Sequence, residues 1–244
     1  MNKKQKLQID NDALGRAYIS YLQGNKKAHF TLHSSDFDPD EIPVSHFFRT
    51  FSKMPKLEQR AILECKGSIL DVGAGSGTHS LELQKRGFDV TAMDISPLAC
   101  EVMKLRGVNN CECVDFFTYA DKKFDTILLL MNGIGIIQTA SNFPAFFSKI
   151  SELLNPGGQI LLDSSDLKYL FENEDGSFDI PLNAEYFGQV DFEVEFNGFI
   201  SEKFEWVYVD FDLLQFEAEK AGFNCSLIME GTHYDYLACL KKIS

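Results

Sequence analysis

A glycine-rich turn between an apolar run and a helical segment limits the folds that are open to this chain. Residues 69–78 read ILDVGAGSGT, so a run with strand propensity leads into three glycines at alternate positions. Glycine lets the backbone turn tightly and lets a ligand approach the main chain without intervening side chains. The first N–H groups of the following helix then face that ligand. The pattern predicts a strand, a turn and a helix, with a ligand site at the turn.

Apolar runs alternate with helical patterns beyond this turn, and strands that alternate with helices predict a parallel sheet covered on both faces. The expected strands are 68–72, 89–94, 111–116, 124–131 and 159–163, and the expected helices are 78–86, 97–106 and 144–154. The closing elements are expected as a helix at 213–221 and strands at 225–229 and 236–241. The overall class is therefore α/β.

Two segments lie outside this alternation. Residues 1–66 read as a helical segment, and residues 167–209 carry two alternating runs around Asn197-Gly198, a dipeptide typical of hairpin turns. Within the first segment, helices are expected at 10–23, 44–51 and 55–65, with a polar loop at 34–43. We therefore expect an N-terminal helical segment and an inserted antiparallel β-hairpin.

The faces of this hairpin predict its register. A two-residue loop would place Val194 opposite Ser201 and mix apolar with polar side chains on one face. A three-residue loop, 196–198, pairs Val194 with Ile200 instead. Because a slip of one residue moves every side chain to the other face, we expect the three-residue loop, with Gly198 at positive φ.

Charge narrows the possible partners. The chain has 23 basic and 36 acidic residues, and residues 151–244 alone carry a net charge of −14. A nucleic acid or an anionic membrane surface would require the opposite sign, so neither is an expected partner. The longest apolar run, 127–131, is far shorter than the roughly 20 residues that span a bilayer. With no export signal and six cysteines expected as free thiols, we expect a cytoplasmic protein.

Three acidic residues stand at the ends of predicted strands. Asp94 lies 21 residues after Gly73, where a carboxylate accepts hydrogen bonds from ribose hydroxyls in sheets of this kind. Asp71 directly precedes the glycine turn, where it would repel a pyrophosphate, and Asp115 follows the next strand. Thr78 stands where the dinucleotide fingerprint carries its third glycine, and His79 follows it. These departures argue against an NAD-type oxidoreductase.

With these residues the chain resembles the class I S-adenosylmethionine-dependent methyltransferases of the small-molecule type, over about residues 67–165. The resemblance implies a seven-stranded, mostly parallel Rossmann-like sheet with an antiparallel last strand. It also implies S-adenosyl-L-methionine as cofactor. The expected domains are a helical cap at 1–66, a cofactor-binding core at 67–166, a hairpin insertion covering the substrate at 167–209, and closing elements of the core at 210–244.

The resemblance also implies which residues bind the cofactor. The methionine part would lie against the glycine loop: Asp71, Gly73, Ala74, Gly75 and Gly77. The ribose hydroxyls would bind Asp94, the adenine would lie against Ile95 and Phe116 with its amino group on Asp115, and the methyl group would be bordered by Met131 and Asn132.

Three of these residues also have simpler interpretations. Asp94 could only cap the helix that begins at Pro97, although Ser96 could also cap it. Asp115 could be a solvated loop acid, and Phe116 could be a core residue.

The resemblance implies an in-line methyl transfer, for which the protein mainly orients the acceptor and excludes water. The sequence identifies no catalytic base, although His46, His79, His233 and Tyr18 are candidates, and no metal site is expected. Residues 132–135 read NGIG and lack the prolines and the aromatic residue of base-methylating relatives, which favours a small-molecule acceptor, neutral or cationic. The alternative is a catalytically inactive binding module or partner subunit. The oligomeric state stays open.

Overall fold

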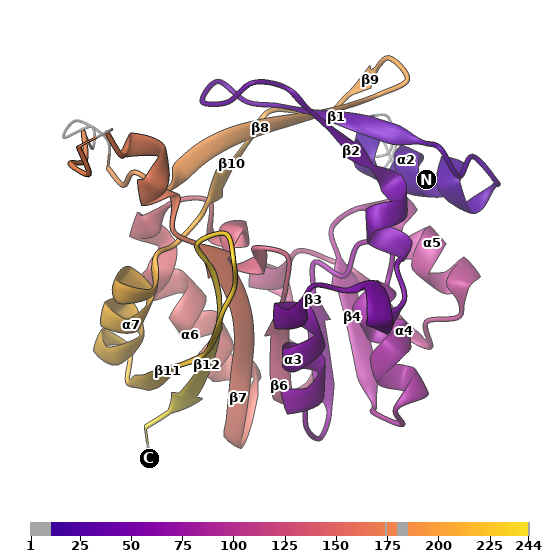
Figure 1. The fold of residues 1–244 in the computed structure, drawn as a ribbon. Helices are drawn as coiled ribbons and strands as arrows, with labels where there is room; N and C mark the ends of the chain where they lie inside the picture. Colours follow the sequence, from indigo (N-terminus) through magenta and orange to yellow (C-terminus); the bar gives the residue numbers. More distant parts are fainter. Residues whose placement is uncertain (1–10, 174, 180–184, 244) are drawn as a thin grey trace. The chain divides into compact units, whose positions relative to one another are not determined.

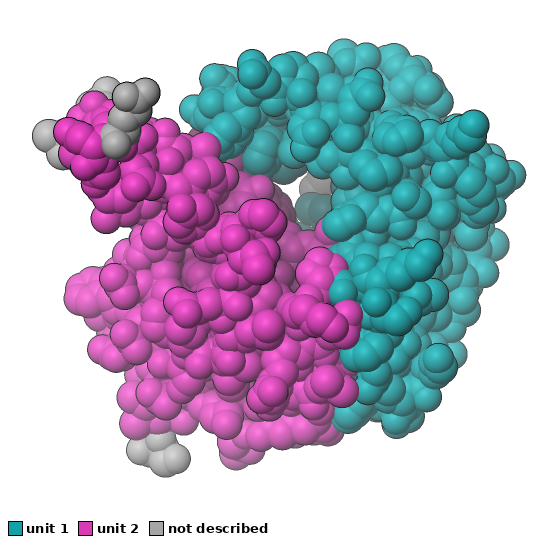
Figure 2. Space-filling model, in the orientation of Figure 1, with its two compact units in different colours: residues 1–54, 70–119, 191–204 teal, residues 55–69, 120–190, 205–244 magenta. Residues whose placement is uncertain are grey.

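The structure is a computed structural model, and it describes residues 11–173, 175–179 and 185–243. The chain divides into two compact units (Figure 2). Unit 1 comprises residues 1–54, 70–119 and 191–204, and unit 2 comprises residues 55–69, 120–190 and 205–244. Each unit therefore combines segments that are far apart in the sequence.

The main sheet has seven strands in the order β11-β12-β7-β6-β3-β4-β5 (Figure 1). In chain order these are β3 (Ile69–Val72), β4 (Val90–Asp94), β5 (Asn110–Cys113), β6 (Phe124–Leu129), β7 (Leu154–Ser165), β11 (Phe223–Glu230) and β12 (Asp235–Lys242). The pairs β4–β5 and β6–β7 are parallel, whereas β12 runs antiparallel to both β7 and β11. The predicted seven-stranded, mostly parallel sheet with an antiparallel last strand, β12, is confirmed.

Unit 1 contains the helices α2 (Ala13–Leu22), α4 (Thr78–Lys85) and α5 (Pro97–Arg106). Helix α2 packs along α5, as Figure 1 shows. Their first turns are joined by Asp12, whose carboxylate caps α2 by accepting from the Gly15 N–H at 2.8 Å and also accepts from the Ser96 hydroxyl at 2.6 Å. One N-terminal carboxylate thus connects the first helix to the Rossmann-like core.

Unit 2 contains the helices α3 (Lys56–Glu64), α6 (Phe143–Leu153) and α7 (Phe211–Lys220). Helix α3 packs on β7 and β12, and α7 packs on β11. The rings of Phe147 on α6 and Phe223 on β11 lie 5.4 Å apart, centroid to centroid. Both side chains are buried, and burial of aromatic side chains stabilises the unit. The described residues of the chain contain no helix that is long and apolar enough to cross a membrane.

Short 3₁₀ segments connect the main elements. They are η1 (Val44–Phe48), η2 (Phe51–Lys53), η3 (Phe116–Thr118), η4 (Gly133–Ile137), η5 (Ala140–Asn142) and η6 (Leu167–Phe171).

The N-terminal segment is not purely helical, which corrects the sequence prediction. It contains the strands β1 (His29–His33) and β2 (Asp40–Pro43), the second within the predicted polar loop. They belong to a second sheet, β10-β8-β1-β2, with β8 (Gln189–Phe196), β9 (Phe199–Ile200) and β10 (Phe204–Val207). Strand β1 pairs antiparallel with both β2 and β8. Its partner in β8 lies more than 150 residues away in the sequence, so no local pattern indicates this pairing.

The inserted antiparallel hairpin forms, but the predicted register is wrong. Glu195 pairs with Ile200 and Phe196 with Phe199, which leaves a two-residue loop. Its residues have φ values of 51° at Asn197 and 79° at Gly198, so the expected positive φ at Gly198 is confirmed.

Side chains around this loop explain why the hairpin can adopt a register that places apolar residues opposite polar ones. Ser201 faces Val194: its N–H donates to the Val194 carbonyl, and its hydroxyl accepts from the Val194 N–H, both at 2.9 Å. Phe199 and Ile200 are 43% and 49% exposed, so they do not need an apolar partner face. Residues 201–203 then leave the strand conformation, and β10 enters the sheet in a new register.

Candidate functional site

The glycine turn of unit 1 begins where the fully buried strand β3 ends. Its three glycines have φ values of 67° at Gly73, 56° at Gly75 and 80° at Gly77, in the left-handed region that disfavours other residues. A Cβ on Gly77 would lie 2.9 Å from Met103 Cγ on α5, whereas a Cβ on Gly73 would have no atom within 4 Å. Gly77 therefore serves packing, whereas the backbone at Gly73 borders open space.

Asp71 is buried beneath this turn, with 1% of its surface exposed. Its carboxylate accepts a hydrogen bond of 2.5 Å from the hydroxyl of Ser80 on α4. Burial raises the pKa of Asp71, and the neighbouring His79 opposes this rise. Asp71 thus ties the strand to the helix that follows the turn and places a negative charge below the turn.

Asp94 ends β4 beside the same turn. One carboxylate oxygen accepts from the Gly75 N–H and the other from the Ser96 N–H, each at 2.8 Å. Burial raises the pKa of Asp94 to about 6. Asp94 is not the cap of α5, because Ser96 takes that role by accepting from the Ala99 N–H at 2.9 Å. The carboxylate is therefore fixed against the glycine turn, and each oxygen retains acceptor capacity.

The residues predicted to surround an adenine also lie in unit 1. Ile95 is 58% exposed directly after Asp94, and Phe116 is buried at the start of η3. Asp115 caps η3 by accepting from the Phe117 N–H at 2.7 Å. Asp115 is exposed, as expected for a solvated loop acid, and Phe116 belongs to the core, so both simpler interpretations describe real features of the fold. Neither feature prevents an additional contact with a ligand.

The N-terminal segment reaches the glycine turn, which the sequence indicated only weakly. The carbonyl oxygen of Phe47 in η1 accepts hydrogen bonds from the hydroxyls of Ser76 and Thr78. On the other side, Arg106 Nη1 donates to the Ser76 carbonyl at 2.6 Å and to its hydroxyl at 2.7 Å. The turn is thus held between η1 and the end of α5.

Tyr18 on α2 lies over the same turn, with its hydroxyl 3.3 Å from the position of a Cβ on Gly75. Burial, together with the charges of Asp94 and Asp12, raises its pKa well above the ordinary value. Its phenol therefore stays protonated at neutral pH and is suited to donate a hydrogen bond rather than to act as a base. From the sequence, Tyr18 was only a candidate base. Its contact with the glycine turn could not be predicted, because the pattern of a helix does not show which of its side chains will lie against a distant segment.

Met131 and Asn132 lie in unit 2, directly after β6. Both have left-handed backbones, with φ of 61° and 56°, which is unusual for two consecutive residues other than glycine. The buried carboxylate of Asp163 on β7 accepts from both N–H groups, at 3.1 Å from Met131 and 2.7 Å from Asn132. This carboxylate stabilises the strained pair, and strain of this kind clusters at functional sites.

The side chain of Asn132 extends this network within unit 2. Its amide donates to the Val207 carbonyl at 3.2 Å, and its carbonyl oxygen accepts from the Ser164 hydroxyl at 2.6 Å. The Ser164 hydroxyl in turn accepts from the Val209 N–H at 2.9 Å. The sequence analysis missed Asp163, although its place at the carboxyl end of a predicted strand was a usable signal.

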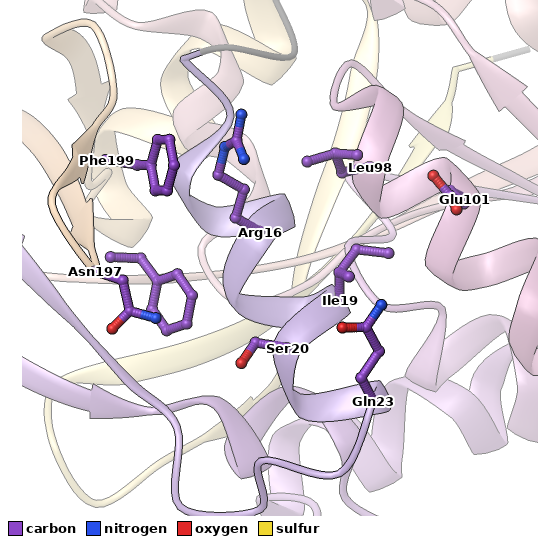
Figure 3. Close-up of a pocket in the computed structure, with 9 residues that line it drawn as sticks. Arg16, Ile19, Ser20, Gln23, Leu98, Glu101, Asn197 and Phe199 are labelled. Carbon is purple, nitrogen blue, oxygen red and sulfur yellow. The ribbon is translucent and has the colours of Figure 1, made fainter.

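The three histidines proposed as bases differ in burial. His79 is buried beside Asp71, whereas His46 and His233 are exposed, in unit 1 and unit 2 respectively. A pocket of about 300 Å³ between α2, α5 and the hairpin tip contains none of the predicted cofactor residues. Figure 3 shows its most prominent contact, the Arg16 guanidinium 3.9 Å from the ring centroid of Phe199. This pocket therefore lies apart from the glycine turn.

Comparison with known proteins agrees with this geometry. The family model described as a methyltransferase domain matches residues 46–226. A crystal structure of an S-adenosylmethionine-dependent methyltransferase from Bacteroides fragilis, in complex with S-adenosyl-L-homocysteine, is 48% identical. The two structures superpose with a TM-score of 0.90, and the match covers 97% of each chain.

Other relatives have lower sequence identity to this chain. A demethylmenaquinone methyltransferase of Tropheryma whipplei is 29% identical over 38% of this chain, and the match spans about 40% of the length of that relative. The sugar N-methyltransferase KedS8 from a Streptoalloteichus species is 14% identical, with a TM-score of 0.56 over 81% of this chain and 90% of its own, and shows the fold alone. The chain belongs to the methyltransferase domain family and is a class I, Rossmann-like S-adenosylmethionine-dependent methyltransferase.

Proposed function

We propose that this methyltransferase transfers the methyl group of S-adenosylmethionine to a small-molecule acceptor, neutral or cationic. The observation that carries the proposal is the segment after β6. There η4 begins with Gly133, and the indole ring of Trp206 covers Gly135 so closely that a Cβ would overlap it. This segment has neither the prolines nor the aromatic side chain on which a flipped nucleobase would stack.

Two further observations support a small acceptor. Residues 151–244 carry a net charge of −14, which disfavours nucleic acids and other polyanions. The partial relative from Tropheryma whipplei is named a demethylmenaquinone methyltransferase, and its name does not refer to a nucleic acid. A cytoplasmic location is consistent with the six cysteines, all of which are free thiols.

The residues predicted from the sequence fit the cofactor in unit 1. The backbone at Gly73 is open, because a Cβ there would have no atom within 4 Å, and the methionine part is proposed to lie along Gly73, Ala74 and Gly75. Asp94 offers acceptor oxygens for ribose hydroxyls, and the protonated hydroxyl of Tyr18 is a donor beside them. Asp71 is proposed to hold the turn and to attract an ammonium group.

The other predicted residues are assigned as follows. Gly77 allows the packing of α4 on α5, and Ile95, Asp115 and Phe116 are proposed to contact the adenine. In unit 2, Met131 and Asn132 are proposed to border the methyl group. S-adenosylmethionine supplies an activated methyl on a sulfonium sulfur. The chain then has to orient the acceptor and exclude water, and a base is required only for an acceptor that carries a weakly acidic proton.

Ligand-induced stabilisation tests the proposed cofactor residues. S-adenosylhomocysteine at about 100 times its dissociation constant should add about 2.7 kcal/mol to the free energy of unfolding. For a chain of this size the melting temperature should rise by roughly 5–10 °C. Asp94→Ala should lose most of this shift, whereas Asp89→Ala, at an exposed acid before β4, should keep it. An equal shift from NADH and none from S-adenosylhomocysteine would contradict the cofactor assignment.

A transfer assay tests the acceptor. The enzyme is incubated with S-adenosylmethionine labelled in its methyl group, together with either fractionated metabolites or tRNA and duplex DNA. Label should appear in a small-molecule fraction. Label in the nucleic acids would overturn the proposal, and absence of label from every metabolite fraction would favour an inactive binding module.

A further inference from the structure

A second pocket lies in unit 1, and Thr78, directly after the glycine turn, is part of its wall. Its volume is about 420 Å³, and it is bounded by the residues after η1, by α4 and by the end of α5. Three basic side chains line it, one from each of these elements: Arg49, Lys85 and Arg106. The same wall contains Thr50 and Ser52, whose hydroxyl oxygens lie 3.3 Å apart, and the apolar side chains of Phe48, Phe51, Met54 and Leu81.

The charge of this pocket contrasts with that of the chain, which is −13 overall. The single acidic residue in its wall, Glu82, already forms an ion pair with Arg86 at 2.8 Å. Three cations in one concavity match the requirements of a multiply charged oxyanion, because such an anion accepts several charge-assisted hydrogen bonds.

Arg106 connects this pocket to the glycine turn. Its described hydrogen bonds run from Nη1 to neutral oxygens of Ser76 and Thr78, at 2.6 to 3.1 Å. The guanidinium group has further donors on Nη2 and Nε. Burial lowers the pKa of Arg106 to about 10, so the surroundings disfavour its charge. An anion in the pocket would compensate for this desolvation without displacing the bonds to the turn.

We propose that this pocket binds a phosphate group, either as inorganic phosphate or as part of a small phosphate monoester, and that its occupation strengthens cofactor binding. The coupling follows from Arg106: an anion that holds the guanidinium in place also holds Ser76 and Thr78, and with them the glycine turn. The binding site is independent of the methyl acceptor, and only the coupling depends on the proposed cofactor residues.

Phosphate binding can be measured directly on the full chain without cofactor. Inorganic phosphate and glycerol 2-phosphate are titrated separately by calorimetry at constant ionic strength, with sodium chloride as the balancing salt. We expect saturable binding with a dissociation constant on the order of 1 mM. Tighter binding of the monoester would identify an organic phosphate as the ligand, and equal or weaker binding would identify the free anion.

Single substitutions test whether phosphate binds in this pocket. Lys85→Gln and Arg49→Gln should each weaken phosphate binding by about tenfold. Lys104→Gln, at an exposed position of α5 outside the pocket, should leave it unchanged. Urea unfolding of each variant shows that the fold is retained. Linear heats up to about 50 mM phosphate, or equal losses in the pocket variants and the control, would overturn the site.

A separate measurement tests the coupling between phosphate binding and cofactor binding. Saturating phosphate should raise the affinity for S-adenosylhomocysteine by about fivefold in the wild type and leave it unchanged in Lys85→Gln. Phosphate that binds without changing this affinity would overturn the coupling. If S-adenosylhomocysteine itself does not bind, the proposed function fails, while the phosphate titration still decides the site.

Discussion

The carboxyl group of Asp94 titrates close to neutral pH, because burial raises its pKa to about 6. The ionised form can accept the proposed hydrogen bonds from ribose hydroxyls with both oxygens, whereas the protonated form has one acceptor fewer. We therefore expect the affinity for S-adenosylhomocysteine to fall as the pH falls through about 6, approaching tenfold per pH unit below it. Calorimetric titrations between about pH 5 and pH 8 measure this dependence, which Asp94→Asn should remove.

Unfolding without ligand should respond in the opposite direction. The pKa of Asp94 in the folded protein lies above its ordinary value of 3.8, so the ionised carboxylate disfavours the folded state. This unfavourable contribution is lost as the pH falls from about 6 towards 4. The free energy of unfolding of the wild type, relative to Asp94→Asn, should therefore rise over this range. A relative fall would contradict the raised pKa.

Asp163 is expected to matter because it satisfies two left-handed N–H groups with one carboxylate. In Asp163→Asn the amide offers one acceptor oxygen, and its NH₂ group would face a buried donor. We expect a loss of about 2 kcal/mol in the free energy of unfolding and a large loss of kcat/KM. Urea denaturation and initial rates measure both.

Two further variants show whether the effects of Asp163→Asn come from the loss of its hydrogen bonds to the segment after β6. Asp121→Asn, at an exposed position, should change neither quantity. Asn132→Gly suits the left-handed backbone but loses the bonds to Ser164 and Val207, so it tests the side chain apart from the backbone. Wild-type turnover by Asp163→Asn would show that the arrangement after β6 does not affect the reaction.

At the scale of elements, η4 is positioned by its contact with β10. A Cβ on Gly135 would overlap the indole ring of Trp206, so Gly135→Ala should lower the free energy of unfolding by about 1–3 kcal/mol through overpacking. Replacing the indole by Leu opens the space. The double variant Gly135→Ala/Trp206→Leu should therefore be more stable than the sum of the single changes predicts.

The contact between Gly135 and the ring of Trp206 should also affect catalysis. Because η4 continues the chain from Asn132, we expect Gly135→Ala to lower kcat/KM while the stabilisation by S-adenosylhomocysteine is retained. Strict additivity of the two substitutions in urea denaturation would show that the ring and the glycine do not constrain each other.

At the scale of the whole molecule, the uneven charge predicts how acceptors respond to salt. A cationic acceptor is attracted by the net −14 of residues 151–244, and salt screens this attraction over a Debye length of about 10 Å at 0.1 M ionic strength. Its KM should rise with ionic strength, whereas the KM of a neutral acceptor should not. Steady-state rates at two salt concentrations distinguish the two classes. Salt-sensitive binding of tRNA or duplex DNA would contradict both.

The sequence by itself determined the elements whose signals are local. The alternation of strands and helices, the order of the core and the closing antiparallel strands are all present in the structure. The three glycines of the turn all have positive φ, as a tight turn requires. These features could be predicted because periodicity and backbone sterics act over a few neighbouring residues. The cofactor roles of Asp71, Asp94 and the other residues of the site stay predictions.

The features that depend on contacts between residues far apart in the sequence were decided only by the tertiary structure. Strand β1 forms because β8 lies beside it, and the hairpin takes the register that the hydroxyl of Ser201 allows. The contacts of Tyr18 and Phe47 with the glycine turn join residues that lie about 30 to 60 positions apart in the sequence. Such contacts leave no periodic trace, because their free energy comes from burial and hydrogen bonds that exist only once the chain has folded.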